Sequence, residues 1–110
     1  MIINEELKRY GVRANAIAPA ARTRMTESTP GLSDVVQKPG DAAVFDSWDP
    51  ANISPLVAAL AMEDSEINGQ VFFVQGGTVR RFQNWTMMET LEKNDRWSVA
   101  ELAEKLPTLI

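Results

Sequence analysis

The chain has 110 residues, of which 45% are hydrophobic and 24% charged, and its eleven basic and fifteen acidic side chains give a formal net charge of −4. This composition suits one globular domain at most, and the acidic balance argues against a broad nucleic-acid surface or an anionic membrane as partner. The chain has no Cys, which excludes disulfides and thiolate chemistry. It also has no His, which removes the commonest general base and metal ligand, so no metal site is expected.

The N-terminal stretch "MIINEELKRYG" carries charge within its first five residues and does not have the pattern of a signal peptide. No segment approaches the roughly 18 consecutive apolar residues that a membrane span needs. We therefore expect a soluble, cytoplasmic protein that binds neither nucleic acid nor membrane.

Residues 2–9 predict the end of a helix, and Gly11 suits the position after it, where a positive φ is usual. Residues 12–18, "VRANAIA", predict a strand that is covered on both faces, because the apolar residues do not alternate with polar ones. Pro19 ends this strand. Asn15 within it is expected to hydrogen-bond neighbouring backbone rather than a substrate.

Residues 20–48 are rich in Thr, Ser, Gly, Pro and Asp, and such a segment is too long for a simple turn. It predicts either a functional lid or a mobile segment. Its scattered apolar side chains either shape an acyl pocket or pack the loop against its own body, and they are Leu32, Val35, Val36, Phe45 and Trp48.

Asp49 and Pro50 predict an N-cap followed by proline at the first helical position, and they open a helix over 50–62 with an irregularity near Pro55. The segment "QVFFVQGG", residues 70–77, predicts a second buried strand that ends in a glycine turn. The resulting unit is a strand, a long excursion, a helix and a parallel strand. Beyond it, only residues 98–106 predict a helix, with Ser98 as N-cap and Glu101 completing a capping box.

The stretches "ELKRYGVRANAIAP", "TRM" and "PANISPLVAALAMEDSEINGQVFFVQGG" occur in an order and spacing that resemble the C-terminal part of short-chain dehydrogenases/reductases. The resemblance spans about residues 5–77. Within the family, "APAARTRMTE" and the aromatic, charged tail look most like actinobacterial oxidoreductases related to the hydroxyacyl-CoA dehydrogenase domain of peroxisomal multifunctional enzymes.

The resemblance implies an α/β fold that is part of a Rossmann-like domain: the last two parallel strands, a crossover helix and a helical C-terminal tail. Residues 1–77 would form the C-terminal part of that domain, with a substrate lid over 19–48, and residues 78–110 would be a C-terminal extension. The family's glycine-rich phosphate turn, catalytic Ser and Tyr-x-x-x-Lys do not occur in this chain. Tyr10 is followed four positions later by Ala14, so it does not match that tyrosine.

The resemblance also implies where an NAD or NADP cofactor would lie in the intact enzyme. Cofactor contacts are expected from Pro19, Ala20, Ala21, Arg22 and Thr23, and the substrate loop from Arg24, Met25 and Thr26. Several residues have a plainer alternative. Pro19 also serves to end a strand, Thr23 also suits the N-cap of a short helix over 24–28, and the two arginines also suit a solvated loop face. Ala20 replaces the family's usual glycine.

The function expected is that of a C-terminal fragment of an NAD(P)-dependent oxidoreductase acting on a hydroxy or oxo substrate, such as an acyl thioester. The intact enzyme would be a homo-oligomer, and the chain alone would be inactive. The alternative is a non-catalytic interaction module that pairs its strands with a partner chain.

Overall fold

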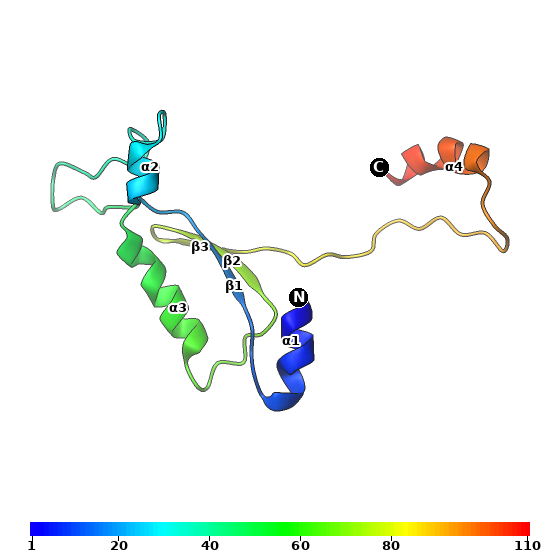
Figure 1. Ribbon diagram of the computed structural model, residues 1–110, viewed down its shortest axis with the longest axis horizontal. Helices are drawn as coiled ribbons and strands as arrows, with labels where there is room; N and C mark the ends of the chain where they lie inside the picture. The colour runs from blue at the N-terminus through cyan, green and yellow to red at the C-terminus, as the bar shows by residue number, and fades with distance from the viewer.

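The computed structural model describes all 110 residues (Figure 1). Its four α-helices are α1 (Ile2–Leu7), α2 (Arg24–Ser28), α3 (Ser54–Ala61) and α4 (Val99–Lys105). Its three strands are β1 (Ala16–Pro19), β2 (Val71–Gln75) and β3 (Thr78–Arg81). Short 3₁₀ turns continue α1 over Lys8–Tyr10, precede α3 over Pro50–Ile53 and follow α4 over Leu106–Leu109.

The sheet has the order β1-β2-β3. Strands β1 and β2 are parallel, with Ala16 opposite Val71, and α3 lies in the connection between them. The predicted strand, helix and parallel strand are therefore confirmed, as is the α/β class. Strand β3 was not predicted. It pairs antiparallel with β2 through a tight turn at Gly76 and Gly77, and thereby adds a hairpin to the parallel pair.

Helix α3 runs beside β1 and β2 (Figure 1). Its apolar side is turned to the sheet, since Val57 and Leu60 line a shallow depression together with Ile17 of β1. The Asp49 side chain accepts a hydrogen bond from Ala51 N, which confirms the predicted cap. The irregularity expected near Pro55 occurs as a change from 3₁₀ to α-helix between Ile53 and Ser54.

The strand predicted over 12–18 begins only at Ala16, because side chains rather than a neighbouring strand hold the residues before it. Arg13 donates from Nη1 to the Leu60 carbonyl at 2.8 Å and from Nη2 to the Met62 carbonyl at 2.9 Å. The amide of Ala14 donates to Asn68 Oδ1 at 2.9 Å. These bonds join the entry of β1 to the C-terminal end of α3 and to the loop that follows it.

Helix α1 ends as predicted, with Gly11 in the left-handed region at φ 72°. Its Asn4 side chain is buried against Gly69, where a Cβ would come within 2.5 Å of Asn4 Nδ2. This close approach explains the glycine at position 69, whose φ is also positive.

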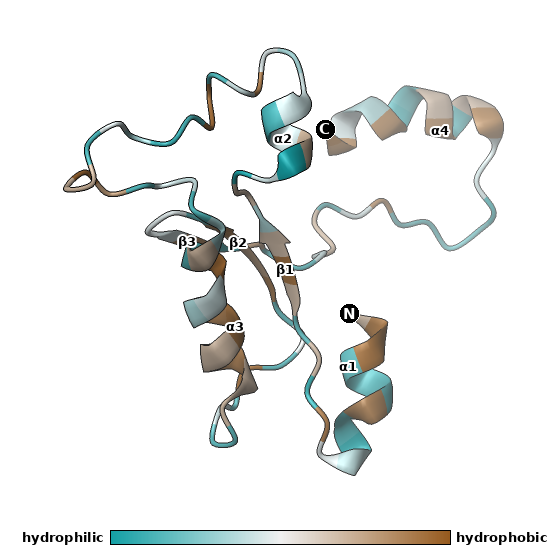
Figure 2. Ribbon diagram, turned by 60° about the vertical axis from the view of Figure 1, so that its left-hand side comes forward, coloured by the Kyte–Doolittle hydropathy of each residue, from teal (hydrophilic) through white to brown (hydrophobic).

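Beyond β3 the chain leaves the sheet as an extended arm, residues 82–97 (Figure 2), and ends in α4 well apart from the other helices (Figure 1). Ser98 accepts from Glu101 N at 3.1 Å, which confirms the predicted N-cap. The second half of the capping box differs, because the Ser98 hydroxyl donates to Glu101 Oε1 in place of the expected backbone bond. No helix is long and apolar enough to cross a membrane.

Candidate functional site

The carboxyl end of β1 leads directly into the residues that the sequence singled out. Pro19 is the last residue of the strand and is exposed. Parallel pairing continues one residue further, since the amide of Ala20 donates to the Val74 carbonyl at 2.9 Å. In open α/β sheets ligands bind at this end of the strands. Ala20 and Ala21 are half-buried and lie at the start of segment 19–48, which is named the lid after the role predicted for it.

Thr23 is the N-cap of α2, in agreement with the plainer alternative drawn from the sequence. Its hydroxyl oxygen accepts from Thr26 N at 3.3 Å, and Thr26 Oγ1 accepts from Thr23 N at 2.7 Å. The two threonines thus satisfy one another's free amides at the start of a five-residue helix. Arg24 and Met25, the other residues predicted for the substrate loop, lie exposed on this helix.

Arg22 is the most highly bonded side chain of the site. Its Nη1 donates to Asp46 Oδ1 at 3.1 Å and its Nη2 to Asp46 Oδ2 at 2.6 Å, a bidentate pair. Nη1 also donates to the Val36 carbonyl at 3.1 Å, and Nε lies 3.5 Å from Glu27 Oε1. The Arg22 and Asp46 side chains are only 13% and 16% exposed, so this arginine is not a solvated loop face.

The pair shifts both ionisation equilibria. The hydrogen bond from Arg22 holds the pKa of Asp46 below its usual value near 3.8, and the Trp48 amide and the charge of Lys38 lower it further by smaller amounts. Partial burial acts in the opposite direction, because it disfavours the charged carboxylate. The same bond raises the pKa of Arg22 further above its ordinary range. Both groups are therefore fully charged at neutral pH.

The base of the lid is joined to the rest of the fold through residues next to Asp46. Asn52 Nδ2 donates to the Asp46 carbonyl at 2.8 Å, and Gln75 Nε2 donates to the Ser47 carbonyl at 2.9 Å. The amide of Arg22 donates to the Trp48 carbonyl at 2.7 Å. The carbonyls of three consecutive residues, Asp46, Ser47 and Trp48, thus accept hydrogen bonds from Asn52, Gln75 and Arg22.

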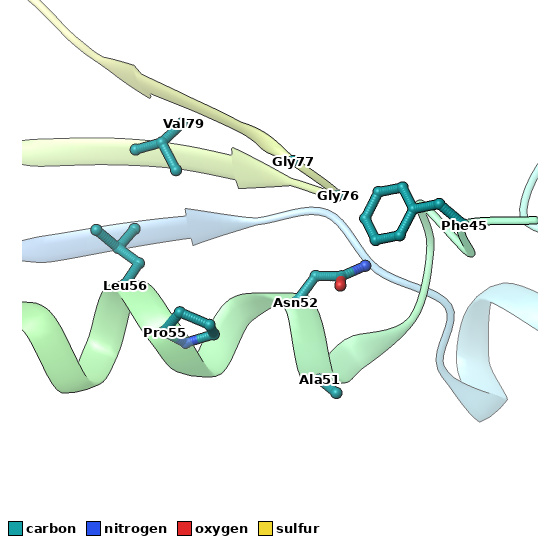
Figure 3. A pocket seen from close by; sticks show the side chains of 8 residues that line it. All are labelled: Phe45, Ala51, Asn52, Pro55, Leu56, Gly76, Gly77 and Val79. Carbon is teal, nitrogen blue, oxygen red and sulfur yellow. The ribbon is translucent and has the colours of Figure 1, made fainter.

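An open groove of about 470 Å³ lies where the lid, the start of α3 and the β2–β3 hairpin meet (Figure 3). Its lining residues are Phe45, Ala51, Asn52, Pro55, Leu56, Gly76, Gly77 and Val79. The Phe45 ring stands at the mouth of the groove beside the hairpin turn. Of the five apolar lid residues, Val36 is buried, at 3% exposed, and Trp48 is half-buried. Leu32, Val35 and Phe45 are exposed, although Phe45 lines the groove.

Asp46 was not identified from the sequence. It lies in a turn-rich segment among other acidic residues, and nothing in its spacing distinguishes it from Asp34 or Asp41. Asn15, by contrast, behaves as predicted: it donates to the Ile67 carbonyl at 2.9 Å and accepts from Gln70 N at 3.0 Å. No group of three or more acidic side chains is placed to hold a metal ion.

No family model matches the chain. Individual relatives do. The chain is 43% identical over 74 residues to hydroxyacyl-CoA dehydrogenase ChsB1 of Mycobacterium tuberculosis and 36% identical over 73 residues to a short-chain type dehydrogenase/reductase of the same organism. Each match covers 66% of this chain and 22% of the relative, so the aligned segment corresponds to about a fifth of the length of these curated proteins.

A crystal structure of a short chain dehydrogenase from Mycobacterium avium matches the fold with a TM-score of 0.72 and 34% sequence identity. The match covers 99% of this chain and 31% of that one, so it includes the extended arm and α4 as well as the sheet. The resemblance read from the sequence motifs is therefore confirmed: this chain is homologous to one segment of the short-chain dehydrogenases/reductases.

Proposed function

We propose that the chain is a C-terminal segment of an NAD(P)-dependent short-chain oxidoreductase acting on a hydroxy or oxo substrate, specifically an acyl thioester. The observation that carries the proposal is that Pro19–Thr23 end and directly follow a parallel strand in a chain that is 43% identical, over 74 residues, to a hydroxyacyl-CoA dehydrogenase. When bound, the nicotinamide supplies hydride transfer. The residues of this chain would form one rim of its site, with Pro19 at the strand tip and the Thr23 hydroxyl facing the carboxamide.

The extent of exposed surface supports the view that this segment works within a larger body. A compact domain of this length has a radius of gyration of about 13 Å, whereas the chain has one of 21.5 Å. Its accessible surface is 9183 Å², against roughly 6,000 Å² for a compact protein of this mass. Residues 1–77 would complete a Rossmann-like domain, and residues 78–110 would extend over a further surface of a cytoplasmic homo-oligomer.

The chain alone is expected to be inactive, because the groups that bind the pyrophosphate and move the proton are not among its residues. Its sequence has no glycine-rich phosphate turn and no Tyr-x-x-x-Lys. The elements that it would contribute, a strand end, a capped helix and a lid, would position the cofactor and the substrate.

One observation favours a second candidate function, a non-catalytic interaction module. Strand β1 is an edge of the sheet, so its outer hydrogen-bonding groups are free to pair with a strand of another chain. Gel filtration with light scattering separates the two. A folded, monodisperse oligomer of the chain would favour the module, and aggregation would favour the enzyme segment.

Two further measurements test the enzyme proposal. The isolated chain, assayed with NADH and NADPH against a panel of ketones and 3-oxoacyl thioesters, is expected to show no turnover, and measurable turnover would overturn the claim that it lacks catalytic groups. Reading the genomic sequence upstream of Met1 is expected to show an in-frame Ser and Tyr-x-x-x-Lys. Their absence would refute the oxidoreductase assignment and leave the interaction module.

A further inference from the structure

The outer part of the lid, residues 30–45, has almost no hydrogen bonds to the rest of the molecule. Its backbone bonds are local: Leu32 N to the Thr29 carbonyl, Val36 N to the Leu32 carbonyl and Val44 N to the Asp41 carbonyl. The one exception is the bond from Arg22 Nη1 to the Val36 carbonyl. Apart from the burial of the Val36 side chain, the middle of the segment is therefore held to the fold by one hydrogen bond from Arg22.

The Arg22 side chain also binds residues near both ends of the lid. Arg22 binds Glu27 on α2, where the lid begins, and Asp46, where the lid returns to the fold. Guanidinium has five N–H donors in a fixed plane, and three of them are used within this chain, two on Nη1 and one on Nη2, while Nε lies 3.5 Å from Glu27 Oε1. A phosphate oxygen could take the two donors that face Asp46 only by displacing its carboxylate.

We propose that Arg22 and Asp46 form a latch that holds the two ends of the lid together beside the carboxyl end of β1, and that Arg22 is a positioning residue of the site rather than a phosphate ligand. The role of the lid rests on the proposed function, but the latch itself is a property of the chain without cofactor. Lysine could not replace Arg22, because an ammonium offers no planar fork for the Asp46 carboxylate and the Val36 carbonyl at once.

The test is amide hydrogen exchange measured by mass spectrometry on all 110 residues, comparing the lid with the β1–β2 ladder in the same molecule. Asp46→Asn keeps the size of the side chain and removes the charge. It is expected to speed exchange at least tenfold at the hydrogen-bonded amides of the lid, those of Leu32, Val36, Val44 and Asp49, while the amides of β1 and β2 keep their wild-type rates. Asp46→Glu, which restores the carboxylate, is expected to recover part of the protection.

Arg24→Gln is the matched control, because Arg24 lies two positions from Arg22 on the same segment, is exposed and forms no ion pair within the chain. It should leave lid exchange unchanged. The wild-type lid should also stay protected when pyrophosphate is added. Three outcomes would overturn the latch. Lid amides could exchange equally fast in wild type and in Asp46→Asn, or their exchange in Asp46→Asn could rise together with that of β1 and β2. Pyrophosphate could also speed lid exchange in the wild-type chain. None of these outcomes bears on hydride transfer, so the latch and the proposed function fail separately.

Discussion

The carbonyl oxygen of Ser47 lies 2.9 Å from the point where a Cβ on Gly76 would stand, and Ser47 Cα lies 3.1 Å from it. Gly76 also has a φ of +55°, in the left-handed region. The hairpin between β2 and β3 therefore touches the lid backbone at a position that only glycine can fill. The contact fixes where Phe45 and the groove of Figure 3 lie relative to the sheet.

Replacing Gly76 by Ala is expected to lower the free energy of unfolding by more than about 1 kcal/mol, because the left-handed backbone alone costs about that much for an L-residue. The clash with the Ser47 backbone adds to it, since a main-chain oxygen cannot rotate away. Urea unfolding followed by tryptophan fluorescence measures the difference. Gly77→Ala is the matched control, as its Cβ would meet only Phe45 Cε1 at 4.0 Å. Equal midpoints for the two variants would contradict the contact.

The Thr23 hydroxyl has two predicted roles, which paired variants distinguish. Thr23→Ala and Thr26→Ala each break the reciprocal cap of α2 and should each destabilise that helix by about 1 kcal/mol. Only Thr23→Ala should also weaken NAD(P)H binding by the full enzyme, because Thr26 makes no predicted cofactor contact of that kind. Exchange of the α2 amides and a fluorescence titration with NADH measure the two effects. Equal loss of cofactor affinity in both variants would leave Thr23 with the cap alone.

Acid is expected to open the lid. The pKa of Asp46 in the folded chain lies below its usual value near 3.8. A depressed carboxyl pKa contributes stability that is complete above the unfolded value and is lost as pH falls through the folded value. The charged groups around the pair, Lys38, Glu27 and Asp49, modify the position of this transition without changing its direction.

Fluorescence of Trp48, whose amide donates to Asp46 Oδ1 at 3.3 Å, is expected to follow this transition below about pH 4. Trp85→Phe and Trp97→Phe in the same chain would leave Trp48 as the single reporter. Asp46→Asn should show the open-lid signal at every pH. A transition of the same size in Asp46→Asn would assign it to other carboxyl groups.

The Asn15 side chain joins the start of β1 to the start of β2, with one donor and one acceptor in use. Asn15→Ala should cost about 1 kcal/mol, the ordinary net value of such bonds. Asn15→Asp should cost more at neutral pH, since a carboxylate would face the Ile67 carbonyl with no hydrogen to donate. The amide of Gln70 should exchange faster in Asn15→Ala, whereas in Asn15→Asp a carboxylate oxygen can still accept its hydrogen bond. Asn94→Ala, at an exposed position without a side-chain hydrogen bond, should change nothing.

Local signals predicted the elements of the fold well where a few neighbouring residues determine the backbone. Gly11 ends a helix, Thr23, Asp49 and Ser98 begin others, and the apolar run before Gly76 forms a strand. Each of these rests on a cap or a periodicity that is contained within a few positions.

The features missed depend on residues far apart in sequence. Strand β3 carries Arg80 and Arg81 and has no apolar alternation, so only its pairing with β2 defines it. Asp46 acquires its role from an arginine 24 positions earlier, which no spacing rule indicates. The exposure of the arm could not be predicted either, because its aromatic and methionine side chains are of the kinds that usually form a core. The assigned cofactor and substrate residues, Pro19–Thr23 and Arg24–Thr26, remain predictions.

The bond between Asn15 and Gln70 spans 55 positions of the chain, and this has a kinetic consequence. At a synthesis rate of about 5–20 residues per second, β1 leaves the ribosome roughly 3 to 11 seconds before its only strand neighbour in this chain exists. During that interval its apolar edge has no partner to the C-terminal side. The lid segment is synthesised between the two strands. Its prolines, glycines and charged residues are poorly suited to pair as a strand with the unpaired edge of β1. We therefore expect the polar composition of residues 20–48 to keep strand β1 from pairing wrongly until β2 has been synthesised.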